Sequence, residues 1–237
     1  MLEVKIITAY PNSFPGALGY SIIGNALEEK KWSLEVINLH NFGYDERKSI
    51  DDVPFGGGPG MIIRPDIVEK ALLSIEQRSD INRQLIYLTP SGKPLQQHNL
   101  LEFSRFNQLI ILCGRFEGVD QRAINALNFL EISIGDYVLA GGEIAAQVLV
   151  EGCIRLLPGV LGQPESLLEE SFSNNLLEYP QYTRPQVWKD TQNNDHEVPK
   201  VLLSGHHENI KQWRAEKSLE KTKLIRPDMF KEKKEQE

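Results

Sequence analysis

The apolar and polar positions of the first 160 residues follow two alternating patterns. Short runs rich in β-branched residues predict strands at residues 4–8, 34–39, 84–88, 109–113 and 129–134. Apolar residues spaced three or four apart predict helices at residues 17–30, 65–77, 94–106, 119–127 and 142–157. Strands that alternate with helices are typical of an α/β fold built on a largely parallel sheet.

The pattern changes after Pro158 and Gly159, where the last long helix is expected to end. The stretch LGQPESLLEESFSNN that follows is polar, which predicts a linker. No strand pattern appears beyond it, and short helices are expected at residues 199–203, at 208–219 and from 227 onward. We therefore expect an α/β domain over residues 1–160, an interdomain linker over 161–175 and a small all-helical domain over 176–237.

The composition limits the class of protein. The 237 residues are 41% hydrophobic and 25% charged, which is typical of a globular protein. The most apolar stretch contains Glu151 and Arg155, so no membrane-spanning helix is expected. The first residues, MLEVKIITAYPNSF, lack the pattern of a secretory signal, and we expect a cytoplasmic protein. Cys113 and Cys153 stand far apart, which predicts two buried thiols and neither a disulfide framework nor a zinc site.

The net charge of −7 is distributed unevenly. Residues 200–237 contain ten Lys and Arg against seven Asp and Glu, a local net charge of +3, so the rest of the chain carries −10. Aromatic side chains are interleaved with basic ones in the C-terminal region, in YPQYTRP, LSGHHENIKQWR and LIRPDMF. Such side chains can stack on unpaired bases and contact the phosphates of RNA. The alternative is that the Tyr and Trp residues form the core of a small helical domain.

Three glycine-bearing segments follow predicted strands: TPSG at residues 89–92, CGRFEGVD at 113–120 and IGDYVLAGGE at 134–143. In parallel α/β sheets, ligands bind at the carboxyl ends of the strands. We expect these segments to form a pocket whose backbone groups bind a flat heterocycle, because glycine lets the backbone approach a ligand closely. The alternative for each segment is an ordinary tight turn.

A fourth glycine-rich segment, PFGGGPGM, covers residues 54–61. It lacks the GK[ST] of a P-loop, and no GxGxxG follows the first strand, so ATPase and conventional dinucleotide-binding functions lose their support. We interpret it as a mobile substrate loop, with a plain surface loop as the alternative. The titratable residues in or beside the loops and linker are Glu117, Asp120, Asp136, Glu143, Arg155, Glu169 and Glu170. Among them, Asp136 and Glu143 lie in the most apolar surroundings and are the best candidates for a functional or network role.

Eight segments, in one order along nearly the whole chain, resemble one family: PFGGGPGM, YLTPSGKPLQQ, CGRFEGVDQR, IGDYVLAGGE, RLLPGVLG, SFSNNLLEYPQYTRP, LLSGHHENIKQWR and LIRPDMF. They resemble the bacterial tRNA (guanine-N1)-methyltransferases of the SPOUT superfamily. The resemblance implies a C-terminal trefoil knot in the α/β domain, made from the three glycine-bearing loops, which binds S-adenosylmethionine in a bent conformation. Periodicity alone predicts an ordinary open sheet, because threaded chains are rare.

The resemblance also implies the residues that contact S-adenosylmethionine. By position in the family's motifs these are Tyr87, Leu88, Pro90, Gly114, Phe116, Glu117, Gly118, Ile134, Gly135, Asp136, Tyr137, Val138, Leu139, Gly141 and Gly142. Besides the base position described below, three positions depart from the family's usual residues: Phe116 replaces tyrosine, Ala140 replaces serine and Asn175 replaces glycine. The first two departures each remove a hydroxyl, and neither prevents recognition of the cofactor by backbone groups.

The reaction implied by the resemblance is methylation of N1 of the guanosine immediately 3′ of the anticodon, in tRNAs where a guanosine also precedes it. N1 carries a proton in neutral guanine, so transfer needs a base and a group that stabilises negative charge on O6. The family uses an aspartate and an arginine, and the corresponding residues here are Glu170 and Arg155. The extra methylene of glutamate moves the carboxylate by about 1 Å, and the adjacent Glu169 is the alternative base.

The family acts as a homodimer on the anticodon stem-loop of tRNA, and the resemblance implies both partners for this chain. Magnesium dependence in the family implies an ion shared with the RNA, because no metal-ligand spacing is present. Two alternatives remain beside the methyltransferase: a non-catalytic RNA-binding protein of the same fold, and a SPOUT enzyme acting on another RNA nucleoside. A nucleotide-dependent oxidoreductase or kinase would need a phosphate-binding fingerprint that the sequence lacks.

Overall fold

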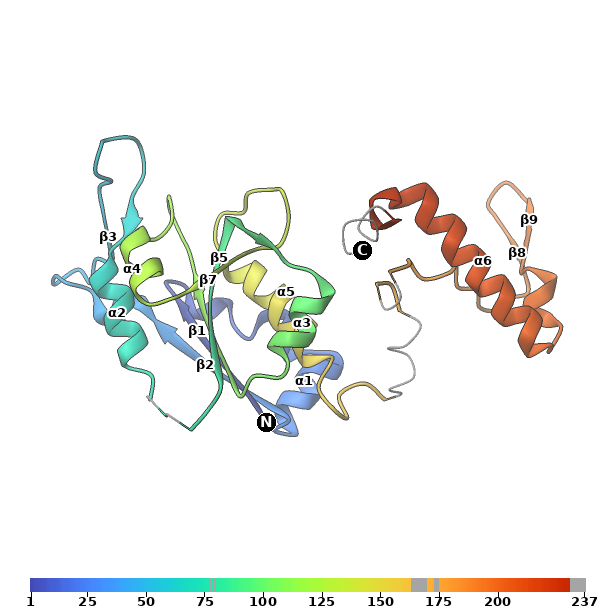
Figure 1. Cartoon of the computed structure of the whole chain (residues 1–237), viewed down its shortest axis with the longest axis horizontal. Helices are drawn as coiled ribbons and strands as arrows, with labels where there is room; N and C mark the ends of the chain where they lie inside the picture. The colour runs from blue at the N-terminus through green and yellow to red at the C-terminus, as the bar shows by residue number, and fades with distance from the viewer. Residues whose placement is uncertain (77, 79, 163–169, 173–174, 231–237) are drawn as a thin grey trace. The chain divides into compact units, whose positions relative to one another are not determined.

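The computed structural model describes residues 1–76, 78, 80–162, 170–172 and 175–230. The chain divides into two compact units, Met1–Gly162 and Gln163–Glu237 (Figure 1). No helix within the described ranges is long and apolar enough to cross a membrane.

The first unit is built on a five-stranded sheet with the order β2-β1-β6-β5-β7. Its strands are β1 (Leu2–Thr8), β2 (Trp32–Asn38), β5 (Arg83–Pro94), β6 (Gln108–Cys113) and β7 (Leu130–Ser133). All neighbouring pairs are parallel, and Ile6 of β1 lies beside Val36 of β2 and Ile111 of β6. The prediction of an α/β fold on a largely parallel sheet is therefore confirmed.

Helices cover both faces of this sheet (Figure 1). One face carries α1 (Ser21–Glu28), α3 (Gln97–Phe103) and α5 (Glu143–Ile154), and the other carries α2 (Pro65–Leu73) and α4 (Gln121–Ala126). Each face has its own apolar cluster. Ile6 belongs to the cluster under α5 and Ile7 to the cluster under α2, because successive side chains of a strand point to opposite faces.

The largest difference from the predicted elements lies at residues 89–92. The segment was expected to be a loop that precedes a helix beginning at Pro94, but β5 continues to Pro94 and α3 begins only at Gln97. The pairing of β5 with β7 shifts register there, so that Leu88 and Lys93 both lie beside Ile132. The extra residues are accommodated as an irregularity within the strand, which hydrophobic periodicity does not reveal.

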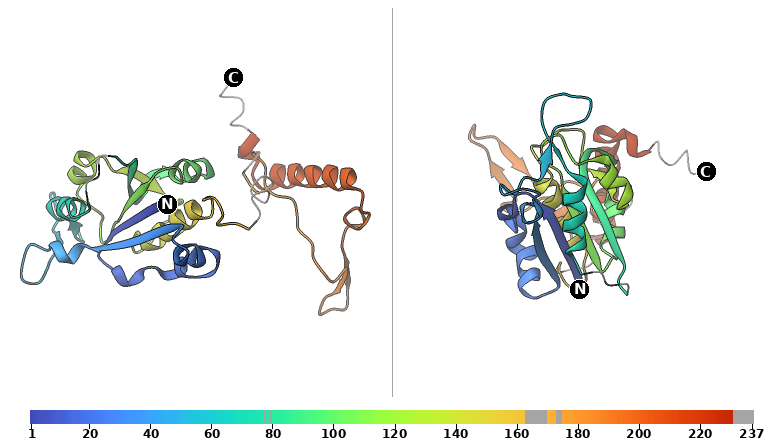
Figure 2. Two further views of the ribbon diagram at one scale, coloured as in Figure 1. Left: turned by 90° about the horizontal axis from the view of Figure 1, so that it is seen from below. Right: turned by 90° about the vertical axis from the view of Figure 1, so that its left-hand side faces the viewer.

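Two short strands were not predicted. β3 (Asp51–Asp52) and β4 (Ile62–Ile63) pair antiparallel and hold the two ends of the PFGGGPGM segment. Two residues are too few to show a strand periodicity. Figures 1 and 2 show the intervening loop projecting from the first unit as an open arch.

The expectation of an all-helical second unit is wrong, because the unit also contains a hairpin. Strands β8 (Val187–Lys189) and β9 (Asp195–Glu197) pair antiparallel, and they precede α6 (His207–Ile225). The carboxylate of Asp190 accepts backbone N–H bonds from Gln192 and Asn194 at 2.8 and 2.9 Å and closes the turn. Here a side-chain oxygen accepts the hydrogen bonds that a backbone carbonyl accepts in an ordinary turn. A hairpin held in this way needs no long pattern of apolar residues, so the sequence pattern does not reveal it.

The helical elements of the second unit otherwise follow the sequence pattern. A 3₁₀ turn at Lys200–Leu203 and another at Pro227–Phe230 flank α6, which extends six residues beyond its predicted end at residue 219. Within this extension the buried Thr222 donates its hydroxyl to the carbonyl of Ser218 at 2.6 Å. This local bond satisfies a polar side chain that otherwise interrupts the apolar pattern.

Candidate active site

A pocket of about 230 Å³ lies where the middle of β5, at residues 87–90, meets the carboxyl ends of β6 and β7. The segments that follow β6 and β7 line it together with this part of β5. Every predicted cofactor residue except Asp136 lines it, and Asp136 is exposed elsewhere on the same loop. The pocket also includes residues that the sequence did not single out as ligands: Thr89, Arg115, Ile132, Ser133, Ala140 and Ala145.

The loops around the pocket are fixed by a close backbone approach. The N–H of Gly142 donates to the carbonyl of Gly114 at 2.9 Å. A Cβ on Gly142 would lie 2.9 Å from the Cα of Cys113, so only glycine allows this approach. The bond joins the end of the loop at residues 134–143 to the end of β6 and defines one side of the pocket.

The pocket combines apolar walls with unused backbone donors. Of the residues that line it, Leu88 and Ile132 are buried, whereas the side chains of Tyr137 and Val138 are 53% and 83% exposed. Among the residues with described positions, none accepts a hydrogen bond from the backbone N–H of Val138, Leu139 or Ala140. Apolar walls with a few convergent polar groups are typical of sites that bind flat heterocycles.

Behind the pocket, a buried carboxylate is part of a polar network. Glu143, in the first turn of α5, accepts the Thr8 hydroxyl at 2.7 Å and pairs with the Arg115 guanidinium at 2.9 Å. Arg115 also donates to the carbonyl of Ala140 at 3.2 Å, and its guanidinium lies 4.2 Å from the centre of the Tyr10 ring. Glu143 therefore has the network role proposed from its sequence context, and it joins α5, β1 and two pocket loops.

Two other titratable residues, one near the pocket and one in its lining, have shifted pKa values. Asp120 caps α4 by accepting the backbone N–H of Arg122 at 2.9 Å, and its carboxylate also binds the Arg122 side chain. Hydrogen bonding from Arg122 lowers the pKa of Asp120. Burial raises the pKa of the Tyr87 phenol, so the ring that lines the pocket stays neutral at physiological pH.

The two candidate catalytic residues lie in different units. Arg155 ends α5 in the first unit, where it is half-buried and its N–H donates to the carbonyl of Glu151 at 3.1 Å. Glu170 belongs to the second unit and is also half-buried. Glu169, the alternative base, lies outside the described residues.

The turn that follows Glu170 is held by local hydrogen bonds. The Ser171 hydroxyl accepts the N–H of Glu178 at 3.0 Å, and the N–H of Phe172 donates to the carbonyl of Leu176 at 2.8 Å. Asn175 has φ = +55°, the left-handed conformation that favours glycine. Asparagine adopts it more readily than most residues, so the replacement of glycine at this position is compatible with the turn.

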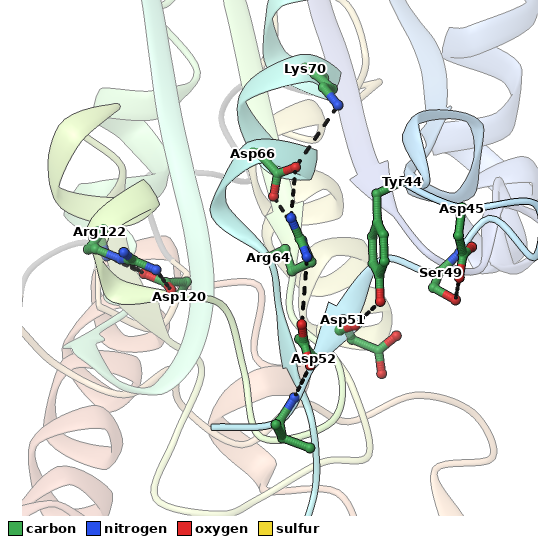
Figure 3. A network of polar contacts seen from close by, with 11 residues as sticks. Tyr44, Asp45, Ser49, Asp51, Asp52, Arg64, Asp66, Lys70, Asp120 and Arg122 are labelled. Atoms are coloured by element: carbon green, nitrogen blue, oxygen red, sulfur yellow. Dashed lines mark hydrogen bonds and ion pairs between the residues drawn. The ribbon is translucent and has the colours of Figure 1, made fainter. Parts of the chain in front are cut away.

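Arg64 fixes the base of the PFGGGPGM loop (Figure 3). Its guanidinium binds Asp66 at 3.0 Å, lies 3.6 Å from the carboxylate of Asp52 and stacks 4.2 Å from the centre of the Tyr44 ring. The hydrogen bond from Arg64 lowers the pKa of Asp66. The loop's two ends are thereby held together while Phe55 within it is 98% exposed.

Aromatic residues of the second unit have mixed environments. Arg214 lies 4.8 Å from the centre of the Tyr179 ring, and the Tyr182 and Trp213 rings are 6.2 Å apart. Trp213 is half-buried, whereas Tyr182 is 47% exposed. The same side chains thus contribute to the packing of the unit and leave aromatic surface available to a partner.

Comparisons with known proteins agree along the whole chain. The family model described as tRNA (Guanine-1)-methyltransferase TrmD matches residues 2–232. The tRNA (guanine-N(1)-)-methyltransferase of Ehrlichia canis is 46% identical over 96% of this chain and 95% of its own. The enzymes of the same name from a Wolbachia of Culex pipiens and from Rhodospirillum rubrum are each 48% identical, over 96% and 97% of this chain and 97% and 92% of their own. The chain therefore belongs to the tRNA (guanine-1)-methyltransferase family.

Proposed function

We propose that this protein transfers the methyl group of S-adenosylmethionine to N1 of the guanosine immediately 3′ of the anticodon in tRNA. Membership of the family supports the reaction class and the RNA substrate. The observation that carries the proposal in this chain is the pocket between the middle of β5 and the carboxyl ends of β6 and β7. The trefoil knot, made by the same loops, is part of the proposal.

The residues of the pocket fit S-adenosylmethionine. The free N–H groups of Val138, Leu139 and Ala140 can hydrogen-bond the edge of an adenine ring, and Leu88 and Ile132 can contact its faces. The Glu117 carboxylate, which also lines the pocket, suits the ammonium group of the methionine part. When bound, the cofactor supplies an electrophilic methyl group on a positively charged sulfur. The pocket loops orient that methyl group and exclude water from it.

Glu170 and Arg155 prepare the guanine for transfer. The Glu170 carboxylate accepts the proton from N1, which leaves the N1 lone pair available to the methyl group; the electron pair of the broken methyl–sulfur bond would remain on sulfur. The Arg155 guanidinium donates hydrogen bonds to O6, where negative charge develops as the proton leaves. The exposed aromatic and basic side chains of the second unit hold the anticodon stem-loop. Among the described residues no cluster of three or more His, Cys, Asp or Glu side chains could hold a metal ion by itself, so a magnesium ion would have to be held jointly with the RNA.

Two copies of the chain form the working enzyme. The pocket lies in one unit of the chain and Glu170 in the other, and a symmetric dimer offers a way for the base to reach a methyl group. Ile144 and Val148 lie one turn apart on α5 and are 58% and 48% exposed, which supports an apolar self-complementary contact. Light scattering should give twice the mass of one chain.

The proposal is tested by incubating the purified protein with methyl-labelled S-adenosylmethionine and two tRNA transcripts. One transcript carries guanosine at the target position and the other carries adenosine there. Label in the first transcript alone supports the proposal. Binding of tRNA without transfer would favour the RNA-binding alternative, and equal labelling of both transcripts would favour another target nucleoside.

A further inference from the structure

β4 connects the PFGGGPGM loop with the cofactor pocket. On one edge β4 pairs with β3, where Asp52 lies beside Ile62. On its other edge it forms a short parallel ladder with the segment Glu117–Asp120, in which Ile63 lies beside Val119. The ladder contains three backbone bonds: Glu117 N–H to Met61 O at 2.9 Å, Ile63 N–H to Gly118 O at 3.0 Å and Asp120 N–H to Ile63 O at 3.0 Å.

A side-chain contact lies directly beside this ladder. A Cβ built on Gly60 would lie 2.6 Å from Oε1 of Glu117, so the Glu117 side chain occupies the space that any larger residue at position 60 would need. Glu117 also lines the cofactor pocket, as does its neighbour Gly118. A single side chain therefore contacts the end of the glycine loop and the pocket at the same time.

The rest of the loop has little to hold it. Val53 and Phe55 are 70% and 98% exposed, and a Cβ on Gly56, Gly57 or Gly58 would meet no atom within 4 Å. In contrast, Ile63 of β4 is fully buried. The contact of Gly60 with Glu117 is the one that lies next to β4, so it influences the direction in which the exposed loop leaves the strand.

We propose that Glu117 acts through Gly60 and β4 as a positioning residue that couples occupancy of the cofactor pocket to the placement of the PFGGGPGM loop on tRNA. The inference rests on the proposed function, since it takes the pocket as the cofactor site and the loop as an RNA contact. A ligand that orders the Glu117–Asp120 segment orders the base of the loop through the three backbone bonds. Binding linkage is reciprocal, so tRNA raises cofactor affinity by the same factor as the cofactor raises tRNA affinity.

The loop offers a matched pair of variants. Gly60 and Gly57 both have positive φ, +88° and +79°, so alanine strains the backbone at both positions. Only the Gly60→Ala methyl group meets Glu117, whereas the Gly57→Ala methyl group meets open space. A difference between the two variants reports the contact with Glu117 and not the loss of glycine.

The experiment measures by calorimetry the affinity for S-adenosylhomocysteine with and without saturating tRNA transcript. In the unmodified protein and in Gly57→Ala we expect tRNA to tighten binding at least about fivefold. In Gly60→Ala the ratio of the two affinities should fall to about one. Should Gly60→Ala fold poorly, Glu117→Ala removes the same contact from the other side. In that variant the ratio of the affinities with and without tRNA should also fall to about one, even if both affinities decrease.

The outcomes separate this inference from the proposed function. Failure of the unmodified protein to bind S-adenosylhomocysteine or tRNA contradicts the proposed function. Binding of both ligands without coupling overturns the inference and leaves the proposed function intact. Full coupling in Gly60→Ala or Glu117→Ala, or equal loss in Gly57→Ala and Gly60→Ala, also overturns it.

Discussion

Replacing Arg115 by methionine tests the importance of the buried network behind the pocket. The Glu143 side chain is 3% exposed, and the Arg115 side chain that pairs with it at 2.9 Å is 23% exposed. Methionine replaces the aliphatic part of the arginine side chain but not its cation. In Arg115→Met the Glu143 carboxylate therefore keeps only its hydrogen bond from the Thr8 hydroxyl, at 2.7 Å. Removing one partner of a buried pair costs about 3–5 kcal/mol, because the remaining charge stays desolvated.

The expected loss can be compared with a surface pair on a neighbouring element. At about 2–4 °C per kcal/mol for a chain of this size, Arg115→Met should lower the melting temperature by about 6–20 °C. In the control Arg122→Met, the lost pair with Asp120 involves an Arg side chain that is 72% exposed. Such pairs contribute about 0–1 kcal/mol, so the control should melt within about 4 °C of the unmodified protein. The two melting temperatures are measured by thermal unfolding followed by circular dichroism. Equal melting temperatures for Arg115→Met and Arg122→Met would refute the stabilising role of the buried pair.

Three further outcomes are expected. Arg155→Ala and Glu170→Ala should each abolish methyl transfer. The affinity for S-adenosylhomocysteine, measured by calorimetry, should stay within about threefold of that of the unmodified protein. Unchanged turnover in either variant would show that the replaced residue takes no part in the mechanism. Hydrogen bonds, first that from His196, lower the pKa of Asp190 from 3.8 to about 2, so carboxyl NMR should show that midpoint and His196→Ala should raise it. Because the folded-state pKa is the lower one, this stabilisation is complete above the unfolded-state pKa and is lost as the pH falls towards 2. Burial raises the pKa of the Cys153 thiol to about 12, so a thiol reagent at pH 8 should modify it only after unfolding, and rapid modification of the native protein would contradict the burial.

The central strand of the sheet, β6, was predictable because it is apolar on both faces. All of β6 is buried, and a continuous run such as LIILC gives a strong strand signal even without alternation. The parallel arrangement then places Leu88 of β5 beside the ends of β6 and β7, and this is why the glycine-bearing segments could be expected to meet. The reaction could be predicted only from the resemblance of the ordered motifs to a known family, because glycine loops of this kind occur in many folds with different functions.

The features that the sequence did not reveal depend on local or long-range polar contacts. The β8–β9 hairpin is closed by the Asp190 side chain and by the Trp188 ring stacked 5.1 Å from the ring of His196, and neither contact has a periodic signature. Arg115 was not singled out, because its importance comes from Glu143, which is 28 residues away. The one available signal was a cation inside a glycine-bearing segment, together with the acidic Glu143 in the apolar stretch at the start of α5.

The most direct test of the central claim is the position of the methyl group on the base. The protein is incubated with deuterium-methylated S-adenosylmethionine and a tRNA transcript that has guanosine on the 3′ side of its anticodon, and the digested nucleosides and fragments are analysed by mass spectrometry. We expect N1-methylguanosine that carries the deuterated methyl group, confined to the fragment with that guanosine. Label on another atom, in another fragment or in no nucleoside of a tRNA that the protein binds would contradict it.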